Sequence, residues 1–216
     1  MPKQSSERRY GGLSAAERRA ARRLRLLNAA LELFGTGGFQ KTTIPQLCSR
    51  AGVTTAHFYD EFPSREAVLT ALYDEIAAGV FGCVRTVLKA PEASMRERVR
   101  AANHVYFEYL TSDPRRARIY ALEVVGISPE HERHRREQRE AFVRQSAKAA
   151  RRVEADRPVD GVDFRLLSVA LAGASNALLV EWVLASPRPA VEAMVDQITA
   201  LWVRTLRLDR SEKEDF

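Results

Sequence analysis

The stretch from residue 34 to residue 65 constrains the fold most, because it predicts two short helices joined by a glycine turn. Thr43 is placed to cap the first helix, and Gln46, three residues later, completes a capping box. Gly52 ends that helix, since glycine accepts the positive φ of a tight bend. Thr54 then caps the second helix. The stretch is therefore a candidate helix-turn-helix.

The second helix of this pair is predicted to have one buried face. Phe58 and Phe62 are four residues apart and so lie on the same side. Pro63 ends the helix, because the residue before proline disfavours helical backbone. Ser64 caps the helix that follows. The face opposite the phenylalanines carries Thr55, Ala56, Tyr59 and Asp60.

Residues in and around this pair of helices match the offsets of a known family. They are Phe34, Gly38 and Phe39, Thr42 and Thr43, Ala51 to Val53, Phe58 and Tyr59, and Phe62 to Glu66. Together they closely resemble the DNA-binding domain of TetR-type bacterial transcriptional regulators. The match covers the first third of the chain, and the rest is similar to the family only in length and all-helical character. The resemblance implies a homodimer that binds a pseudo-palindromic DNA operator.

The positive charge of the chain is concentrated at its N-terminus. Residues 1–25 contain eight Lys or Arg and two Glu, a balance of +6 that equals the net charge of all 216 residues. We interpret residues 1–13 as a flexible basic arm suited to phosphate contact, with a solvated tail as the alternative. Apolar content of 45% and charged content of 29% are otherwise ordinary for a soluble protein.

The number of cysteines and the character of the N-terminal segment bear on the cellular compartment that we expect. Cys48 and Cys83 are too few for a disulfide framework and favour a reducing environment. No signal peptide is visible, and the longest uncharged stretch, 166–180, is too short to span a bilayer. We therefore expect a cytoplasmic protein with no membrane partner.

Helical periodicity continues through the chain without strand-like alternation, which predicts an all-α fold of about nine helices. The first helix should bury Leu24, Leu27, Leu31 and Phe34. We expect a helix-turn-helix domain over 14–64, a ligand-binding and dimerisation domain over 65–208, and a polar tail over 209–216. A long helix over 65–88 would link the domains, and the later helices are expected at about 91–110, 115–125, 129–153, 163–185 and 191–208.

The last two of these helices are the most apolar. Their apolar surface exceeds what one small bundle needs, so we assign part of it to a homodimer interface, which the family resemblance also implies.

The resemblance carries specific DNA contacts over to matched positions. They are Thr43, Thr54, Thr55, His57, Tyr59 and Arg65. Tyr59 would meet a phosphate through its hydroxyl, and Thr54 and Thr55 would meet phosphate or base edges. The outer face of the first helix adds four arginines that could reach the DNA backbone or a minor groove: Arg18, Arg19, Arg22 and Arg23. For each residue, a solvated or capping side chain is the alternative.

The chain departs from the family at Asp60 and Glu61, where many relatives carry a basic or aromatic residue. A carboxylate close to a DNA phosphate would be repelled by it. A carboxylate can accept a hydrogen bond from cytosine, but we favour a position turned away from DNA.

Polar residues on apolar faces of the C-terminal domain suggest a ligand pocket, because burial penalises them unless they find partners. The candidates are Asn103, Glu123, Ser175 and Asn176, with Tyr106, Tyr120, His104 and Trp182 as further lining. We hypothesise that they converge on a small, largely apolar ligand. The alternative is hydrogen bonding within the core or the dimer seam.

Other chemistry has little support. His131 and His134 are three apart on a helix but lie in an arginine-rich run, so we interpret them as surface residues rather than metal ligands. Cys48 is predicted to be a core residue, and Cys83 would be a redox sensor only if exposed and acidified. No catalytic or cofactor motif is present, so we expect neither enzymatic activity nor a cofactor.

The family resemblance implies a repressor that a small molecule releases from DNA. Two alternatives stay open. One is a small-molecule carrier or cryptic enzyme on the same fold, with DNA binding weakened by Asp60 and Glu61. The other is a DNA-binding activator.

Overall fold

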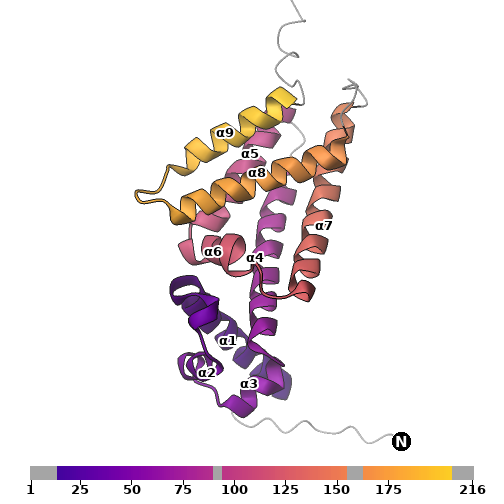
Figure 1. Ribbon diagram of the computed structural model, residues 1–216. Helices are drawn as coiled ribbons and strands as arrows, with labels where there is room; N and C mark the ends of the chain where they lie inside the picture. The colour runs from indigo at the N-terminus through magenta and orange to yellow at the C-terminus, as the bar shows by residue number, and fades with distance from the viewer. Residues whose placement is uncertain (1–13, 90–93, 155–162, 206–216) are drawn as a thin grey trace, which may run out of the picture. The chain divides into compact units, whose positions relative to one another are not determined.

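The computed structural model describes residues 14–89, 94–154 and 163–205. Within these ranges the chain forms nine α-helices, one 3-10 helix and one π-helix, and no strand, as the sequence predicts (Figure 1). The predicted N-terminal arm and polar tail lie outside the described residues. The chain divides into two compact units, Met1–Leu72 and Tyr73–Phe216.

The N-terminal unit is a small helical domain, which we call the head. Its described part contains α1 (Ala15–Gly37), the 3-10 helix η1 (Phe39–Lys41), α2 (Ile44–Ala51), α3 (Thr55–Glu61) and the first two turns of α4 (Arg65–Leu88). Helix α1 packs against η1, α2 and α3, and α2 packs against α3. The head therefore extends past the predicted boundary at residue 64, to Leu72, and includes the fully buried Val68 and Leu69 of α4.

The buried face of α1 differs from the predicted one. Leu26, Leu27 and Ala30 are buried, whereas Leu24 is 56% exposed. Two residues turn an α-helix by about 200°, so a buried arc that contains Leu26 leaves Leu24 on the far side. The prediction for Leu24 was wrong, and that for Phe34 is confirmed, since Phe34 has no exposed surface.

The C-terminal unit is a bundle built around the rest of α4. Its other elements are α5 (Met95–Thr111), α6 (Pro114–Arg118), the π-helix η2 (Ile119–Glu123), α7 (Pro129–Glu154), α8 (Phe164–Leu184) and α9 (Val191–Thr205). Helix α9 packs along α5 and on α8, α7 packs along α8, and α6 packs on both α5 and α8. Helices α8 and α9 form an antiparallel hairpin (Figure 1). The single helix predicted over 115–125 is instead α6 followed by the wider turn of η2.

Two helices are long and apolar enough to cross a membrane by length and composition alone, Arg65–Leu88 and Arg165–Leu184. The sequence-based expectation counted only uncharged residues and missed them. A core helix of a soluble protein passes the same test, and 44% of the α4 window is buried inside the fold. The buried share of the α8 window is 28%, which leaves much of its apolar surface uncovered.

Candidate functional site

The helix-turn-helix of the head is fixed by its caps. Thr43 and Gln46 form the predicted capping box at the start of α2: the Gln46 amide donates to Thr43 Oγ1, and the Thr43 amide donates to Gln46 Oε1 at 2.8 Å. Gly52 ends α2 in the left-handed region at φ +62° and ψ +44°. Thr54 Oγ1 accepts from the His57 amide at 3.2 Å and so caps α3. These local bonds set the angle between the two helices.

Helix α3 has the two faces that the sequence predicts. Phe58 is completely buried and Phe62 is 2% exposed, and their rings lie 6.2 Å apart. Tyr59 is 56% exposed, and it shares the solvent-facing surface with Thr54, Thr55, Ala56, His57 and Asp60. A helix held by one aromatic face leaves the other free to enter a groove.

The start of α3 borders a basic depression in the surface of the head. Three arginines of α1 line it, at one-turn and two-turn spacing: Arg18, Arg22 and Arg25. Thr54 and His57 line the same depression. Four of the predicted DNA contacts, Arg18, Arg22, Thr54 and His57, are therefore brought together.

The end of α3 is tied to α1 by a buried ion-pair cluster, which we call the Glu61 clamp. The Glu61 side chain is 1% exposed, and its two oxygens accept from Arg19 Nε and from an Arg22 terminal nitrogen, both at 3.1 Å. Arg19 also donates to the Asp60 carbonyl at 3.1 Å. Arg23 lies over the Phe62 ring, with its Cζ 4.3 Å from the centroid. Cations are favoured where the last carbonyls of a helix lack partners.

The clamp explains the departure at Glu61 but not at Asp60, whose side chain is exposed. Glu61 points into the head and is neutralised by arginines, so it presents no acidic side chain at the surface. Sequence alone favoured a position turned away from DNA for both residues. Glu61 does turn inward, onto partners that the sequence did not identify, whereas Asp60 is exposed on the same side of α3 as Tyr59. Because Arg19 and Arg22 serve the clamp, they hold α3 in place whether or not they also meet DNA.

Arg65 also has an internal role. Its guanidinium donates to the Thr42 carbonyl and lies over the Phe39 ring, with its Cζ 4.2 Å from the centroid. Its side chain is only 23% exposed. The contacts join the start of α4 to the loop before α2. The sequence indicated a phosphate contact and gave no sign of this bracing.

The C-terminal unit contains a partly open cavity of about 220 Å³ lined by residues of α4, α5, η2, α7, α8 and α9. Five of the eight predicted ligand residues line it: Asn103, Tyr106, Tyr120, Ser175 and Asn176. Asn103 donates to Thr199 at 3.2 Å, which ties α5 to α9. The Ser175 hydroxyl donates to the Leu171 carbonyl of its own helix at 3.0 Å, so Ser175 is already satisfied.

Three tyrosines form one wall of the cavity. The rings of Tyr73 and Tyr120 stack at 5.4 Å, and Tyr106 meets Tyr120 edge-on at 6.3 Å. Burial raises the pKa of the Tyr120 phenol well above its ordinary value and has the same effect on the pKa of Tyr106. Both hydroxyls are therefore neutral and serve as hydrogen-bonding groups rather than as acids.

Two family models match the chain. One, bacterial regulatory proteins of the tetR family, matches residues 26–72, and the other, a tetracyclin repressor-like C-terminal domain, matches residues 92–206. The second match alone covers more than half of the chain. The chain belongs to the TetR family of transcriptional regulators.

Similar proteins agree with this assignment. RutR of Escherichia coli strain K12 is 28% identical over 112 residues, which cover 51% of this chain and 51% of RutR, so the chain spans about half the length of that relative. EthR of Mycolicibacterium smegmatis is 24% identical over 92% of this chain and 90% of its own length. FadR from Bacillus subtilis, solved in complex with stearoyl-CoA, has the same fold, with a TM-score of 0.73 at 17% identity over 82% of this chain and 96% of that chain.

Three ligand residues predicted for this TetR-family regulator lie outside the cavity. His104 pairs with Glu192 at 2.9 Å on the α5–α9 surface. Glu123 pairs with Arg118 at 2.8 Å. Trp182 is buried at the other end of α8, with Arg188 4.4 Å above its ring, whereas Trp202 of α9 lines the cavity. The helical period of a single segment does not reveal which neighbouring helix covers it.

The arginine-rich helix α7 is the largest surprise in this TetR-family fold. Arg135, Arg136 and Arg139 line the cavity together with Glu132 and Phe142. Sequence reasoning interpreted the run as a solvated face, and Arg136 and Arg139 are indeed exposed, but it missed that these two and the half-buried Arg135 also line the cavity. A signal was present: the three arginines are one turn or one residue apart, and Phe142 continues their side of the helix.

His131 is buried, whereas the sequence analysis predicted a surface residue. It is 4% exposed, with its ring 6.3 Å from that of Tyr73, so the expectation of a surface residue was wrong. His134 is half-buried, and its Nε2 lies 2.6 Å from Asp74 Oδ1. Within the described ranges, no group of His, Cys, Asp and Glu is placed to hold a metal ion. Cys48 is a buried core residue, as predicted, and Cys83 is half-buried.

Proposed function

We propose that this regulator binds a pseudo-palindromic DNA operator as a homodimer, through α2 and α3 of each copy, and that a small molecule in the C-terminal cavity releases it. The protein would then act as a repressor. The observation that carries the DNA-binding part is the solvent-facing side of α3, where Thr55 and Tyr59 stand opposite a fully buried Phe58. A helix presented in this way fits the major groove, and the basic depression beside it fits the phosphate backbone.

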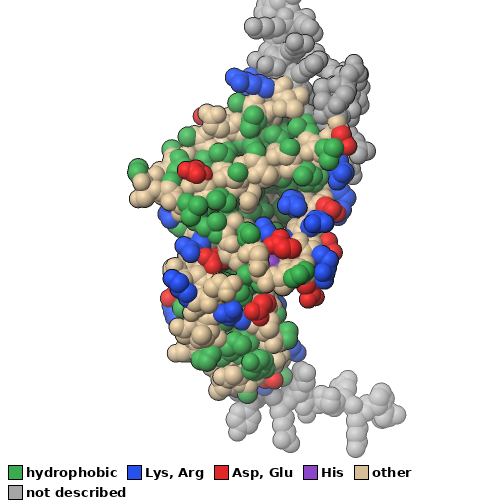
Figure 2. All heavy atoms as spheres, in the orientation of Figure 1, with side chains coloured by type: hydrophobic (Ala, Val, Ile, Leu, Met, Phe, Trp, Pro, Cys, Tyr) green, Lys and Arg blue, Asp and Glu red, His purple; other side chains and the backbone are tan. Residues whose placement is uncertain are grey.

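Exposed apolar surface on the last two helices supports the dimer. Leu166, Leu184 and Leu201 are 55%, 67% and 49% exposed. The exposed apolar and small residues of α8 fall on one side at spacings of three, four or seven residues: Leu166, Ala170, Gly173, Ala177 and Leu184. Two charged residues of α8, Arg165 and Glu181, are exposed as well. Figure 2 shows hydrophobic side chains along α8 and α9 on one face of the unit. A second copy that covers this face would also bury the apolar surface of α8.

The solved FadR complex supports the ligand part, because a protein of this fold has been solved in complex with stearoyl-CoA. Ligand binding would favour a separation of the two heads that no longer fits the operator. The carrier alternative loses part of its basis, since Glu61 is buried and paired.

Operator binding can be tested by fluorescence anisotropy with tiled duplexes from the DNA that flanks the gene, at physiological salt and with nonspecific competitor. We expect one tile to bind tightly. Tyr59→Ala should weaken that binding about tenfold, as expected for loss of an interaction worth about 1.4 kcal/mol. Tyr59→Phe keeps the ring and removes only the hydroxyl, so it tests the proposed phosphate contact. Weak, salt-sensitive binding to every tile would contradict a specific operator.

Dimer formation can be tested by sedimentation. Ala177→Asp places a charge on the exposed side of α8 and should shift the protein to monomer. Ala141→Asp, at an exposed position of α7, is the matched control and should leave the mass unchanged. A reporter gene behind the bound tile then gives the sign of regulation, since a repressor lowers expression and an activator raises it.

A further inference from the structure

The lining of the C-terminal cavity has two chemically different parts. One is apolar and aromatic: Phe81 and Phe142 stack at 5.2 Å with their planes 15° apart, next to Val84, Val99, Leu171 and Trp202. The other is the cationic side of α7, with Arg135, Arg136 and Arg139. Figure 2 shows a hollow below α8 with hydrophobic side chains inside it and basic side chains at its edge.

The cationic part is only partly neutralised. Glu132 is the one carboxylate in the lining, against three arginines, which leaves an excess of two positive charges. Both Glu132 oxygens accept from Arg135 at 3.0 Å, and the Gly126 amide donates to one of them at 3.0 Å. Among the residues that the structure describes, Arg136 and Arg139 form no ion pair with a carboxylate.

Arg135 interacts with Glu132 and with the Tyr73 phenol, yet one of its buried donors has no partner. Its Nε is buried and has no hydrogen-bond partner in the described structure, although its terminal nitrogen is paired with Glu132. Buried donors in native proteins are nearly always satisfied, so a group without a partner requires an explanation. An acceptor supplied by a ligand would satisfy it.

We propose that the cavity binds an amphipathic organic anion. Its apolar body would lie among Phe81, Phe142 and Leu171, and its anionic head would be held by Arg136, Arg139 and the free donor of Arg135. This inference rests on the proposed function, in which the cavity is the ligand site, and it replaces the largely apolar ligand expected from sequence. Guanidinium groups suit carboxylate and phosphate heads equally, because both accept paired hydrogen bonds.

The size of the cavity limits the apolar body. A cavity of 150 Å³ lined by apolar residues holds a benzene molecule, so about 220 Å³ suits an unbranched body of about eight carbons. Octanoate is therefore the first probe. Octan-1-ol has the same chain without the charge, and octanoyl-coenzyme A carries its charge on phosphates.

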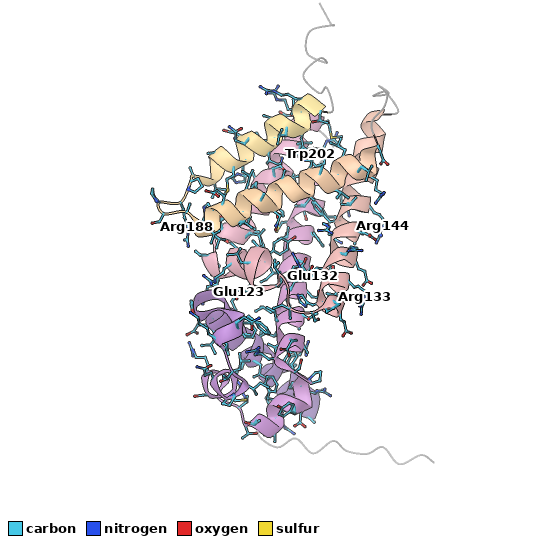
Figure 3. All side chains as sticks on the ribbon, in the orientation of Figure 1. Glu123, Glu132, Arg133, Arg144, Arg188 and Trp202 are labelled. Atoms are coloured by element: carbon cyan, nitrogen blue, oxygen red, sulfur yellow. The ribbon has the colours of Figure 1, made fainter. Side chains whose placement is uncertain are left out.

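The test measures affinity of the full-length protein by calorimetry and by the fluorescence of Trp202, which lines the cavity. We expect octanoate to bind at least tenfold more tightly than octan-1-ol. The double variant Arg136→Gln, Arg139→Gln should lose at least tenfold for octanoate and less than twofold for octan-1-ol. Arg133→Gln and Arg144→Gln are the controls, because both side chains point away from the bundle on the same helix (Figure 3). Circular dichroism checks that each variant folds.

The binding measurements and the operator-release measurement test the anion proposal and the proposed function separately. Equal affinity for octanoate and octan-1-ol, or an equal loss in the Arg133→Gln control, would overturn the anion proposal. Tighter binding of octanoyl-coenzyme A, lost in the double variant, supports it and assigns the head to phosphate; binding of octanoate alone supports it and assigns the head to carboxylate. Operator release is measured separately by anisotropy. Release by a neutral compound that does not need Arg136 or Arg139 would overturn the anion proposal and leave the proposed function intact, whereas anion binding without release would contradict the proposed function alone.

Discussion

The head and the C-terminal bundle are both helical, yet their candidate sites are built in different ways. In the head, the exposed face of α3 is set by bonds between residues at most four apart, such as the Thr54 cap and the Phe58–Phe62 pair. In the bundle, the cavity draws one or a few side chains from each of six elements that are far apart in sequence. The first site can be derived from local rules, and the second depends on how whole helices pack.

The Glu61 clamp joins residues far apart in the sequence of the head, as the Arg65 contacts with Thr42 and Phe39 also do, and breaking it should give the largest effect. Glu61→Ala removes the buried acceptor of Arg19 and Arg22, which lie 42 and 39 residues away in sequence. Loss of one partner of a buried ion pair costs several kcal/mol. Because Arg19 is mostly exposed, we expect a smaller loss of about 2 kcal/mol in the stability of α3.

Hydrogen exchange of the α3 amides measures this loss in the head itself, since both tryptophans lie in the other unit. Asp60→Ala is the matched control, because Asp60 is exposed and is expected to change stability by less than about 0.5 kcal/mol. Equal exchange rates in the two variants would show that the clamp does not hold α3.

The clamp also shows where sequence reasoning about the head ends. Caps, turns and the inward phenylalanines were predicted, because each depends on neighbours along the chain. The orientation of Glu61 was only inferred as a preference, and the bracing role of Arg65 was missed, since both depend on residues more than 20 positions away. Even the α1 stripe was misjudged at Leu24, because helical period fixes the width of a buried face but not its centre.

The bundle was less predictable for the same reason. Asn103 and Tyr106 were correctly placed at the cavity, since polar and aromatic residues on an apolar face favour such a place. Trp182 and Trp202 are both on apolar helices, and only packing decides that Trp202 reaches the cavity. The α7 arginines belong to a stretch so rich in charged residues that local rules predict a solvent-exposed face.

A matched pair of glycines in α4 tests how tightly the bundle is packed. A Cβ at Gly79 would lie 2.0 Å from the Tyr109 hydroxyl oxygen and 2.3 Å from Cζ, whereas a Cβ at Gly82 would meet nothing within 4 Å. Gly82→Ala should therefore stabilise the helix by about 0.5–1 kcal/mol through backbone entropy. Gly79→Ala has the same favourable entropy effect but must displace the Tyr109 ring, so we expect the free energy of unfolding to fall by about 1–2 kcal/mol.

Urea unfolding followed by tryptophan fluorescence reports this difference, because both tryptophans belong to the bundle. If the two variants were equally stabilised, Tyr109 would be free to move aside, and the α4–α5 contact would be loose rather than close-packed.

The smallest effect should be a dependence of the stability of the bundle on pH. Burial lowers the pKa of His131 below its ordinary value of 6.5, so the folded protein holds this imidazole neutral. Between the ordinary value and the lowered one, the unfolded chain binds a proton that the folded chain does not, and the free energy of unfolding falls as pH falls.

His131→Phe keeps an aromatic ring beside Tyr73 and removes the titration. The stability of the wild type should therefore decline more steeply than that of the variant below about pH 6.5. If the unfolding free energies of wild type and His131→Phe changed with pH in parallel, protonation of His131 would not destabilise the folded protein. This part of the bundle would then be accessible to water.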